Sequence, residues 1–426
     1  MANQEHLALI QQGVAVWNEW YQKHKRVIPD LVKANLSNLN LSGINLKKAN
    51  LVGANFNNTD LSQGQLINAN LEGANLLGAD LQATNLKGAN LDYAILSLTR
   101  LNNKTIIPTK SRRVWEIVNN QTQDKNFTGL DLSKSNLFRA DLSNADLSNA
   151  KLEGTNFNSA KLNNAYLFKA NLTAANLQNA DLQNAYFSQA NLTKAYLSGA
   201  KCCGAYFKDA ELKLANLKGA KLSQKTMLDL KWYSVWEIVN HGAVRKNLSG
   251  ADLSYANLQG VNFAEANLTN ANLSHAVLSY SNLDRANLTN TDLAGTNVSG
   301  VDLERANLKG AKLKSIVGRD FSKVAVNAPP PGNFSNVMVK ERPTTLQAVA
   351  TPTLTVTSTP VVVTPTKSQL AKKKTHFGLI SLISIASVVV GGYIYLQQNP
   401  NFTWNEIFSK LQPWKEKVEQ LIPVSY

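Results

Sequence analysis

The sequence predicts an all-β solenoid, and two observations carry that prediction. Every fifth residue from Leu31 to Leu101 is Leu or Phe, and the same spacing returns in two later blocks. A period of five matches neither the 3.6 residues of a helical turn nor the two-residue alternation of a strand. Short repeats of fixed length stack on one another, so we expect a chain that extends along one axis.

The period keeps its own register in each of three blocks. The first block spans 31–101, the second 127–227 and the third 248–315. Cys202 and Val298 depart from Leu and Phe at the periodic position, and Met227 is a weaker last member. Ala usually stands two places before the periodic residue, and Asn or Asp one place before it. In an extended segment residues two apart point the same way, so Ala and Leu are predicted to fill a narrow interior while Asn or Asp points outward.

The two residues that follow each periodic residue are rich in Ser, Gly, Asn, Lys and Gln, which favour turns. The chain is therefore predicted to change direction once per repeat, so that several corners close one coil. Neighbouring coils then pair through parallel backbone ladders spaced about 4.8 Å apart.

Units such as Ala69-Asn70-Leu71 and Ala145-Asp146-Leu147 resemble the pentapeptide repeat family over about residues 31 to 315. The resemblance implies a right-handed quadrilateral parallel β-helix with four pentapeptides in each coil. The sequence itself supports that coil length in part, because outward residues of one kind recur at intervals of 20. Two such columns are Tyr166, Tyr186, Tyr206 and Asp141, Lys161, Asp181, Lys201.

Two interruptions of the period share the sequence Val-Trp-Glu-Ile-Val-Asn, and a looser version opens the chain. We expect each to form a short helix that covers the apolar end of the coil that follows it. These caps or inserts occupy 1–30, 102–126 and 228–247, around Trp17, Trp115 and Trp236. The pattern allows three capped modules in series, or one continuous solenoid with two helical excursions. Together with the repeats, these segments look like cyanobacterial members of the family.

The sequence changes character after the third block. Residues 316–371 are rich in Pro, Thr and Val and predict an extended linker. Lys372, Lys373 and Lys374 then precede an uncharged segment, 377–396, which is long enough to cross a hydrocarbon core as a helix. Residues 372–396 are therefore predicted to form a basic flank and a transmembrane helix.

The tail, 397–426, places Trp404 and Trp414 on one apolar helical face, which predicts a helix on the membrane surface or, alternatively, docking to a partner. Lysines are concentrated before the predicted span, and no apolar run near Met1 resembles a signal peptide. We therefore expect a single-pass membrane protein with a cytoplasmic solenoid and a short tail on the far side. The resemblance implies a plasma or thylakoid membrane.

The formal net charge of +15 would ordinarily prompt a search for nucleic acid. Nearly half of the excess lies in 314–376, beside the predicted span, where it favours a lipid-facing flank. Some members of the resembled family are acidic DNA mimics that inhibit gyrase. The repeats of this chain are neutral to basic, so we expect neither that mimicry nor nucleic-acid binding.

Residue patterns typical of catalysis are missing from the sequence. Cys202 holds an interior position and Cys203 points outward, the five His are scattered, and no phosphate loop or nucleophile elbow occurs. We expect no enzyme activity, no catalytic residue, and no cofactor, metal or small-molecule site.

The best candidate for an interaction surface is the column of Tyr166, Tyr186 and Tyr206, here named the aromatic stripe. Aromatic side chains are enriched at interfaces, but stacked tyrosines can also serve stability alone. The sequence thus predicts a non-enzymatic, membrane-anchored scaffold whose partners are the bilayer and an unidentified protein. The alternative is an accessory or regulatory subunit of a membrane transporter or envelope assembly system.

Overall fold

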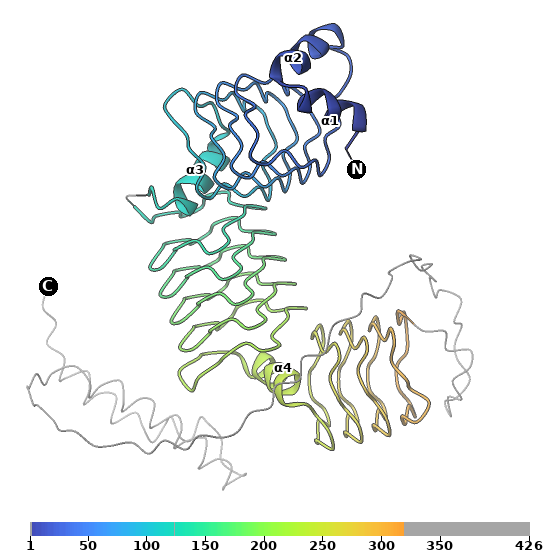
Figure 1. The fold of residues 1–426 in the computed structure, drawn as a ribbon. Helices are drawn as coiled ribbons and strands as arrows, with labels where there is room; N and C mark the ends of the chain where they lie inside the picture. Colours follow the sequence, from blue (N-terminus) through green and yellow to red (C-terminus); the bar gives the residue numbers. More distant parts are fainter. Residues whose placement is uncertain (1, 123, 319–426) are drawn as a thin grey trace, which may run out of the picture. The chain divides into compact units, whose positions relative to one another are not determined.

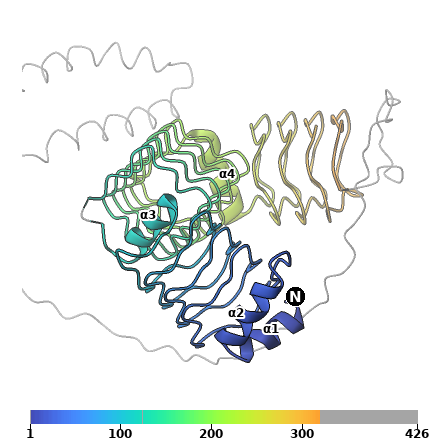
Figure 2. The same cartoon turned by 90° about the horizontal axis from the view of Figure 1, so that it is seen from above.

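The computed structural model describes residues 2–122 and 124–318, where the chain winds into stacked coils (Figure 1). Parallel bridges pair residues 20 apart, and the four columns of one coil begin with Asp30–Asn50, Asn35–Asn55, Asn40–Asp60 and Asn45–Gln65. Four pentapeptides therefore complete one coil, as predicted. Figure 2, turned by 90°, shows the coils of the second block nested behind one another. Among the described residues the pairing consists of isolated bridges rather than longer strands.

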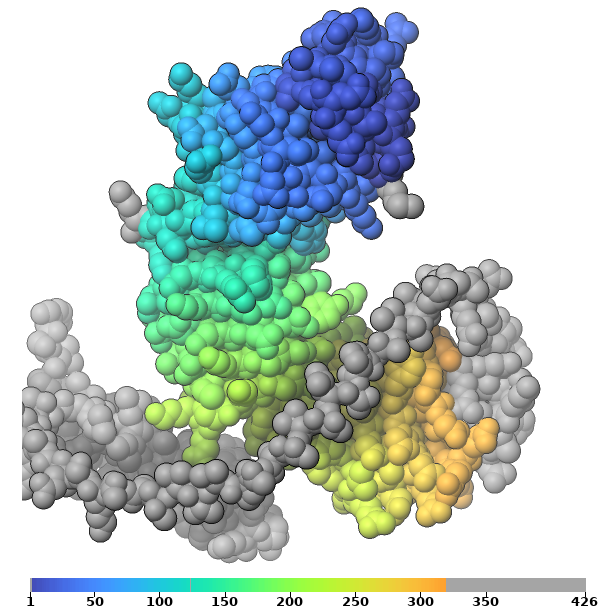
Figure 3. Space-filling view, in the orientation of Figure 1, coloured from blue at the N-terminus to red at the C-terminus, as the bar shows by residue number. Residues whose placement is uncertain are grey.

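The interior is filled as the period predicts. Periodic residues such as Leu51 and Phe56 and the alanines two places before them, such as Ala54, have no exposed surface. Phe187 and Phe207 stack across neighbouring coils with ring centroids 4.7 Å apart. The space-filling view shows the coils of each block packed against one another (Figure 3).

The Asn or Asp before each periodic residue does more than point outward. Its side-chain oxygen accepts a hydrogen bond from the amide two residues on, at 2.8 Å from Ser62 N to Asp60 Oδ1 and 2.9 Å from Ser148 N to Asp146 Oδ1. Such Asx turns are a property of short carboxylate and amide side chains. Asn residues also bond between coils, since Asn55 Nδ2 donates to Asn35 Oδ1 at 3.0 Å.

The corner after each periodic residue is a tight turn. Ala34 N donates to Leu31 O at 3.0 Å, and Lys33 between them has a φ of 57°. A positive φ at the third turn position is the geometry of a type II turn, which Gly and Asn adopt most readily. This requirement explains why Gly and Asn recur two places after the periodic residue.

The backbone ladder breaks twice. The bridges of the first block end at Asn85–Ile106, those of the second run from Asn126–Asp146 to Tyr206–Met227, and those of the third begin at Asn247–Asn267. No bridge between described residues crosses from one block to the next. The described residues thus form three separate ladders of bridges.

Helices α1 (Gln4–Gln11) and α2 (Val14–Lys23) take the place of a coil before the first block. Within the ladder, each residue that forms a bridge uses its amide and its carbonyl for hydrogen bonds to a neighbouring coil. In the first coil, the carbonyl of Asn45 accepts from Trp17 Nε1 at 2.7 Å, and its amide donates to Asn18 Oδ1 at 2.8 Å. The indole of Trp17 is fully buried. Trp17 therefore caps the coil that follows it, as predicted.

Helices α3 (Thr109–Val118) and α4 (Leu230–His241) differ from the prediction, because their Trp and Asn side chains bond the block that precedes them. Trp115 Nε1 donates to Thr99 O at 3.0 Å, and Asn119 Oδ1 accepts from Leu98 N at 2.6 Å. In α4, Trp236 Nε1 donates to Ala220 O, and Asn240 Oδ1 accepts from Gly219 N. These bonds replace the ones that a further coil would supply, so each helix closes the last coil of its block.

The end of the first block and the end of the second block are closed by the same arrangement of residues, with an offset of 121 residues. Leu101 to Asn120 and Leu222 to His241 share a Lys-Thr pair and the Val-Trp-Glu-Ile-Val-Asn sequence. Each begins with the same one-residue insertion, because the last bridges of the two blocks join residues 21 apart. We call these two stretches the closing segments.

No helix within the described residues is long and apolar enough to cross a membrane. The linker after 318, the Lys372, Lys373 and Lys374 flank, the predicted span and the tail with Trp404 and Trp414 lie outside the described residues.

Candidate interaction surface

The aromatic stripe forms a continuous column on one face of the second block. Parallel bridges join Tyr166 to Tyr186 and Tyr186 to Tyr206. The ring centroids are 6.5 Å apart in the first pair and 4.8 Å in the second, where the rings are nearly parallel at 15°. Tyr166 is 57% exposed, and the other two rings are half-buried. The structure therefore brings the three predicted residues together on an exposed column.

The corresponding columns of the other blocks are polar. The stripe residues correspond to the residues 121 positions earlier, which is the offset between the closing segments. In the first block these are Asn45, Gln65 and Asn85, which are bridged in the same way. In the third block, Tyr166 and Tyr186 correspond to Asn287 and Asn307, whose side chains bond each other at 3.2 Å. The same position in the same fold is thus satisfied by amides, and the fold does not require aromatic rings there.

The stripe continues beyond the residues that sequence reasoning identified. Met227 is bridged to Tyr206 and is 56% exposed. Leu230 and Tyr233, at the start of α4, follow within six residues and are 81% and 49% exposed. The sequence predicts Met227 as the last interior residue of the second block, but the one-residue insertion shifts it onto the outward column, where it is exposed. The available signal was the position after Lys-Thr, which holds Ile106 in the first closing segment and Met227 in the second. The exposed apolar surface is therefore longer than three tyrosines.

Two lysines stack on the face next to the stripe. Lys201 and Lys221 are bridged across neighbouring coils, and both side chains are exposed. Opposite charges across a ladder contribute about 0.2–1 kcal/mol, whereas like charges directly opposite each other destabilise. The corresponding pair in the first block is Asp80 and Arg100, which form an ion pair at 2.8 Å. In the second block both residues of this pair are cations, so they form no ion pair with each other.

Acidic and basic residues alternate along the column of Asp141, Lys161, Asp181 and Lys201, but among these four residues an ion pair forms only at the first step. Lys161 Nζ lies 3.7 Å from Asp141 Oδ2 in the next coil. Burial alone would raise the pKa of Asp141, but hydrogen bonds from Ser143 and Lys125 outweigh it and lower the pKa to about 2. Asp181 and Lys201 are bridged through the backbone, yet no ion pair forms between them within 4.0 Å. Lys201 therefore remains available to an external anion.

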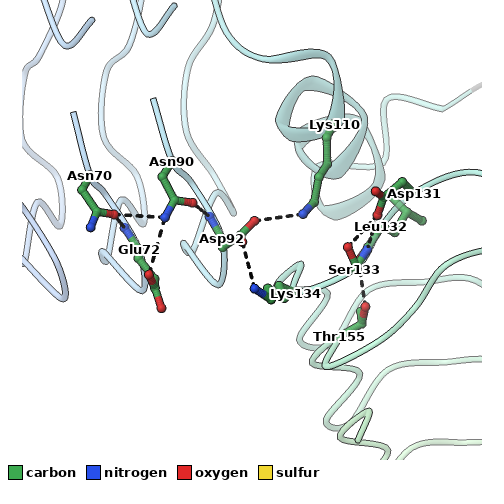
Figure 4. A network of polar contacts seen from close by, with 10 residues as sticks. All are labelled: Asn70, Glu72, Asn90, Asp92, Lys110, Asp131, Leu132, Ser133, Lys134 and Thr155. Carbon is green, nitrogen blue, oxygen red and sulfur yellow. Dashed lines mark hydrogen bonds and ion pairs between the residues drawn. The ribbon is translucent and has the colours of Figure 1, made fainter. Parts of the chain in front are cut away.

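Polar contacts also link the first two blocks at α3 (Figure 4). Asp92 Oδ1 accepts from Lys110 Nζ at 2.9 Å, and Asp92 Oδ2 lies 4.0 Å from Lys134 Nζ. The amide of Tyr93 donates to Lys134 O at 2.6 Å. At the second junction the amide of Leu214 donates to the carbonyl of Tyr255 at 2.7 Å, again 41 residues on. The junctions are thus repeated parts of the fold.

The two cysteines differ in their exposure. Burial raises the pKa of the Cys202 thiol to about 12, and its side chain is 1% exposed. Cys203 is partly exposed, and its Sγ lies 3.7 Å from Lys221 O. No group of three metal-ligating side chains is gathered anywhere in the part of the chain that the structure describes.

Family comparisons match the repeat blocks. The family of pentapeptide repeats matches in eight copies over residues 30–63, 65–103, 247–279 and 281–315, and a pentapeptide repeat region matches residues 140–217. Together the matches span about half of the chain, so the chain belongs to the pentapeptide repeat family. Members of this family fold as right-handed quadrilateral β-helices. None of the curated proteins matches the chain.

Solved structures of the same family are similar in sequence. HetL, from the cyanobacterium Nostoc sp. PCC 7120 and involved in heterocyst differentiation regulation, is 25% identical over 67% of this chain and 87% of its own, with a TM-score of 0.19. The Nostoc protein alr5209 is 38% identical over 22% of this chain and 84% of its own, with a TM-score of 0.15. A pentapeptide repeat protein of the Arabidopsis thaliana thylakoid lumen is 30% identical over 26% of this chain and 75% of its own, with a TM-score of 0.16.

Proposed function

We propose that this protein is a non-enzymatic scaffold that binds a partner protein through the aromatic stripe of its second block. One observation carries the proposal: Tyr166, Tyr186 and Tyr206 occupy a column that is Asn and Gln at the corresponding places of the first block. Because amides satisfy the fold at this position, the fold does not require the tyrosines, which leaves their exposed surface for binding. Exposed aromatic residues are typical of protein interfaces.

The closing helices support a passive, rigid role for the repeats. The first and second blocks each end in a helix whose hydrogen bonds replace those of a further coil, at Trp115 for the first and Trp236 for the second. Capping of this kind keeps repeat proteins from growing by edge pairing. The first two blocks thereby offer their side faces, and not their closed ends, to a partner.

We further propose that the scaffold is tethered to a membrane, with the repeats on the cytoplasmic side of a plasma or thylakoid membrane. This rests on the sequence alone, on Lys372, Lys373 and Lys374 followed by the uncharged segment 377–396. Deleting all residues after Leu370 tests the tether, since the shortened chain should leave the membrane fraction and still capture its partner. Loss of capture on deletion would instead favour the accessory-subunit role, in which the membrane segment makes the specific contacts.

Crosslinking in native membranes followed by mass spectrometry tests the scaffold itself. The triple variant Tyr166→Asn, Tyr186→Asn, Tyr206→Asn should lose the crosslinked partner that the unaltered chain captures. Tyr196→Asn is the matched control, because Tyr196 is 48% exposed on a different column, between Asn176 and Asn216. If the triple variant captures the same partner as the control, the stripe is not the binding surface.

A further inference from the structure

The lysines beside the aromatic stripe identify the chemistry of its partner, an inference that rests on the proposed scaffold function. Lys201 and Lys221 are stacked across neighbouring coils, and Asp181, which is bridged to Lys201 on its other side, forms no ion pair with it within 4.0 Å. Lys225, on the corner that leads to Met227, is also exposed. None of the three forms an ion pair with a described residue, and they border one edge of the stripe.

The first block has different residues at the positions that correspond to the lysine pair and the stripe. There Asp80 Oδ2 accepts from Arg100 Nη2 at 2.8 Å, and the adjoining column is Asn45, Gln65 and Asn85. In the second block both columns differ together, since aromatic rings replace amides and a lysine pair replaces an ion pair. Two coupled departures on neighbouring faces of one block point to one ligand that contacts both.

We infer that the partner contributes an acidic amphipathic segment, whose apolar side chains lie on the stripe and whose carboxylates pair with Lys201, Lys221 and Lys225. The apolar contact runs from Tyr166 to Met227 and on toward Leu230. The carboxylates supply the charge that the stacked lysines lack, so binding relieves their mutual repulsion.

Three synthetic fluorescent peptides test the inference on the full chain by fluorescence anisotropy. In the first, Glu alternates with Phe and Leu; in the second, Lys replaces every Glu; in the third, Ser replaces every Phe and Leu. The first peptide should bind at least about tenfold more tightly than either of the others, and its binding should weaken at high salt. Equal binding of the second peptide would overturn the charge assignment, and equal binding of the third would overturn the apolar one.

Lys201→Asp is the decisive variant, because it copies the Asp80–Arg100 pair by placing a carboxylate opposite Lys221. The variant should melt no lower than the unaltered chain and should bind the first peptide about tenfold more weakly. Lys87→Asp is the control, since it makes the same charge change at an exposed corner of the first block and should leave binding unchanged. Unchanged binding in Lys201→Asp would overturn the inference.

Other occupants of this surface give distinguishable results. Self-association that the triple Tyr variant abolishes, measured by light scattering, would assign the stripe to a second copy and overturn the inference. Vesicles of phosphatidylserine that compete with the first peptide would assign the lysines to lipid and also overturn it. If crosslinking to a partner depends on the tyrosines while the first peptide does not bind, the scaffold stands and only this partner chemistry falls.

Discussion

At the scale of single residues, four of the five positions of the pentapeptide have a physical reason. The periodic Leu and the Ala two places before it are buried, the Asn or Asp between them closes an Asx turn, and the residue two places after Leu adopts a positive φ. Departures from the pattern follow the same reasoning. At several places where Thr replaces the buried Ala, its hydroxyl donates to a carbonyl of the preceding coil, as Thr155 Oγ1 does to Leu132 O at 2.7 Å.

Ser135 shows what happens when that preceding coil is missing. It lies in the first coil of the second block, and its buried Oγ has no hydrogen-bond partner among the described residues. Ser135→Ala should therefore change the free energy of unfolding by less than about 0.5 kcal/mol or raise it, whereas Thr155→Val should lower it by about 1 kcal/mol. Chemical denaturation of both variants checks this, and equal losses would contradict it.

The two adjacent cysteines should differ sharply in reactivity. Because burial raises the pKa of Cys202 to about 12, its thiol stays protonated throughout the pH range of ordinary labelling. Iodoacetamide at mildly alkaline pH should therefore modify Cys203 in the folded chain and both cysteines only after unfolding. Mass spectrometry of the labelled peptides reads the result, and modification of Cys202 in the folded chain would show that the second block opens locally.

At the scale of elements, the helices act as substitutes for coils. Each supplies donors and acceptors to the backbone groups that an edge coil would otherwise leave unpaired, which removes the hazard of edge pairing. The Trp side chains of α3 and α4 donate hydrogen bonds to carbonyls at the same separation earlier in the sequence, from Trp115 to Thr99 and from Trp236 to Ala220. The Trp and Asn of each helix therefore close the block that the helix follows, while Lys231 of α4 also donates to Asp252 and Ser254 of the third block.

Truncation tests that assignment. A chain ending at residue 121 keeps α3 and should melt cooperatively, whereas one ending at residue 107 loses the partners of Leu98 N and Thr99 O and should melt at a lower temperature. Circular dichroism of the two fragments makes the comparison. Equal melting temperatures would mean that α3 does not stabilise the first block.

At the scale of the whole molecule, the sequence predicts the repeat architecture well because one spacing determines which side chains are buried. The coil length, the buried register and the column of Tyr166, Tyr186 and Tyr206 all follow from residues five and 20 apart. The direction of capping does not follow, because Trp115 lies between two apolar coil ends and the sequence alone does not distinguish them. The lysine pair does not follow from the period either, because it differs from the ion pair of Asp80 and Arg100 only when the two blocks are compared position by position.

The melting temperature of the triple variant Tyr166→Asn, Tyr186→Asn, Tyr206→Asn tests the central claim most directly, that the stripe serves binding on a fold that does not need it. Two ring pairs contribute at most about 3 kcal/mol between them, and Asn at these positions regains the inter-coil amide bonds that Asn287 and Asn307 make. We therefore expect the variant to melt close to the unaltered chain. Unfolding of the second block at growth temperature would contradict the claim and make the tyrosines structural.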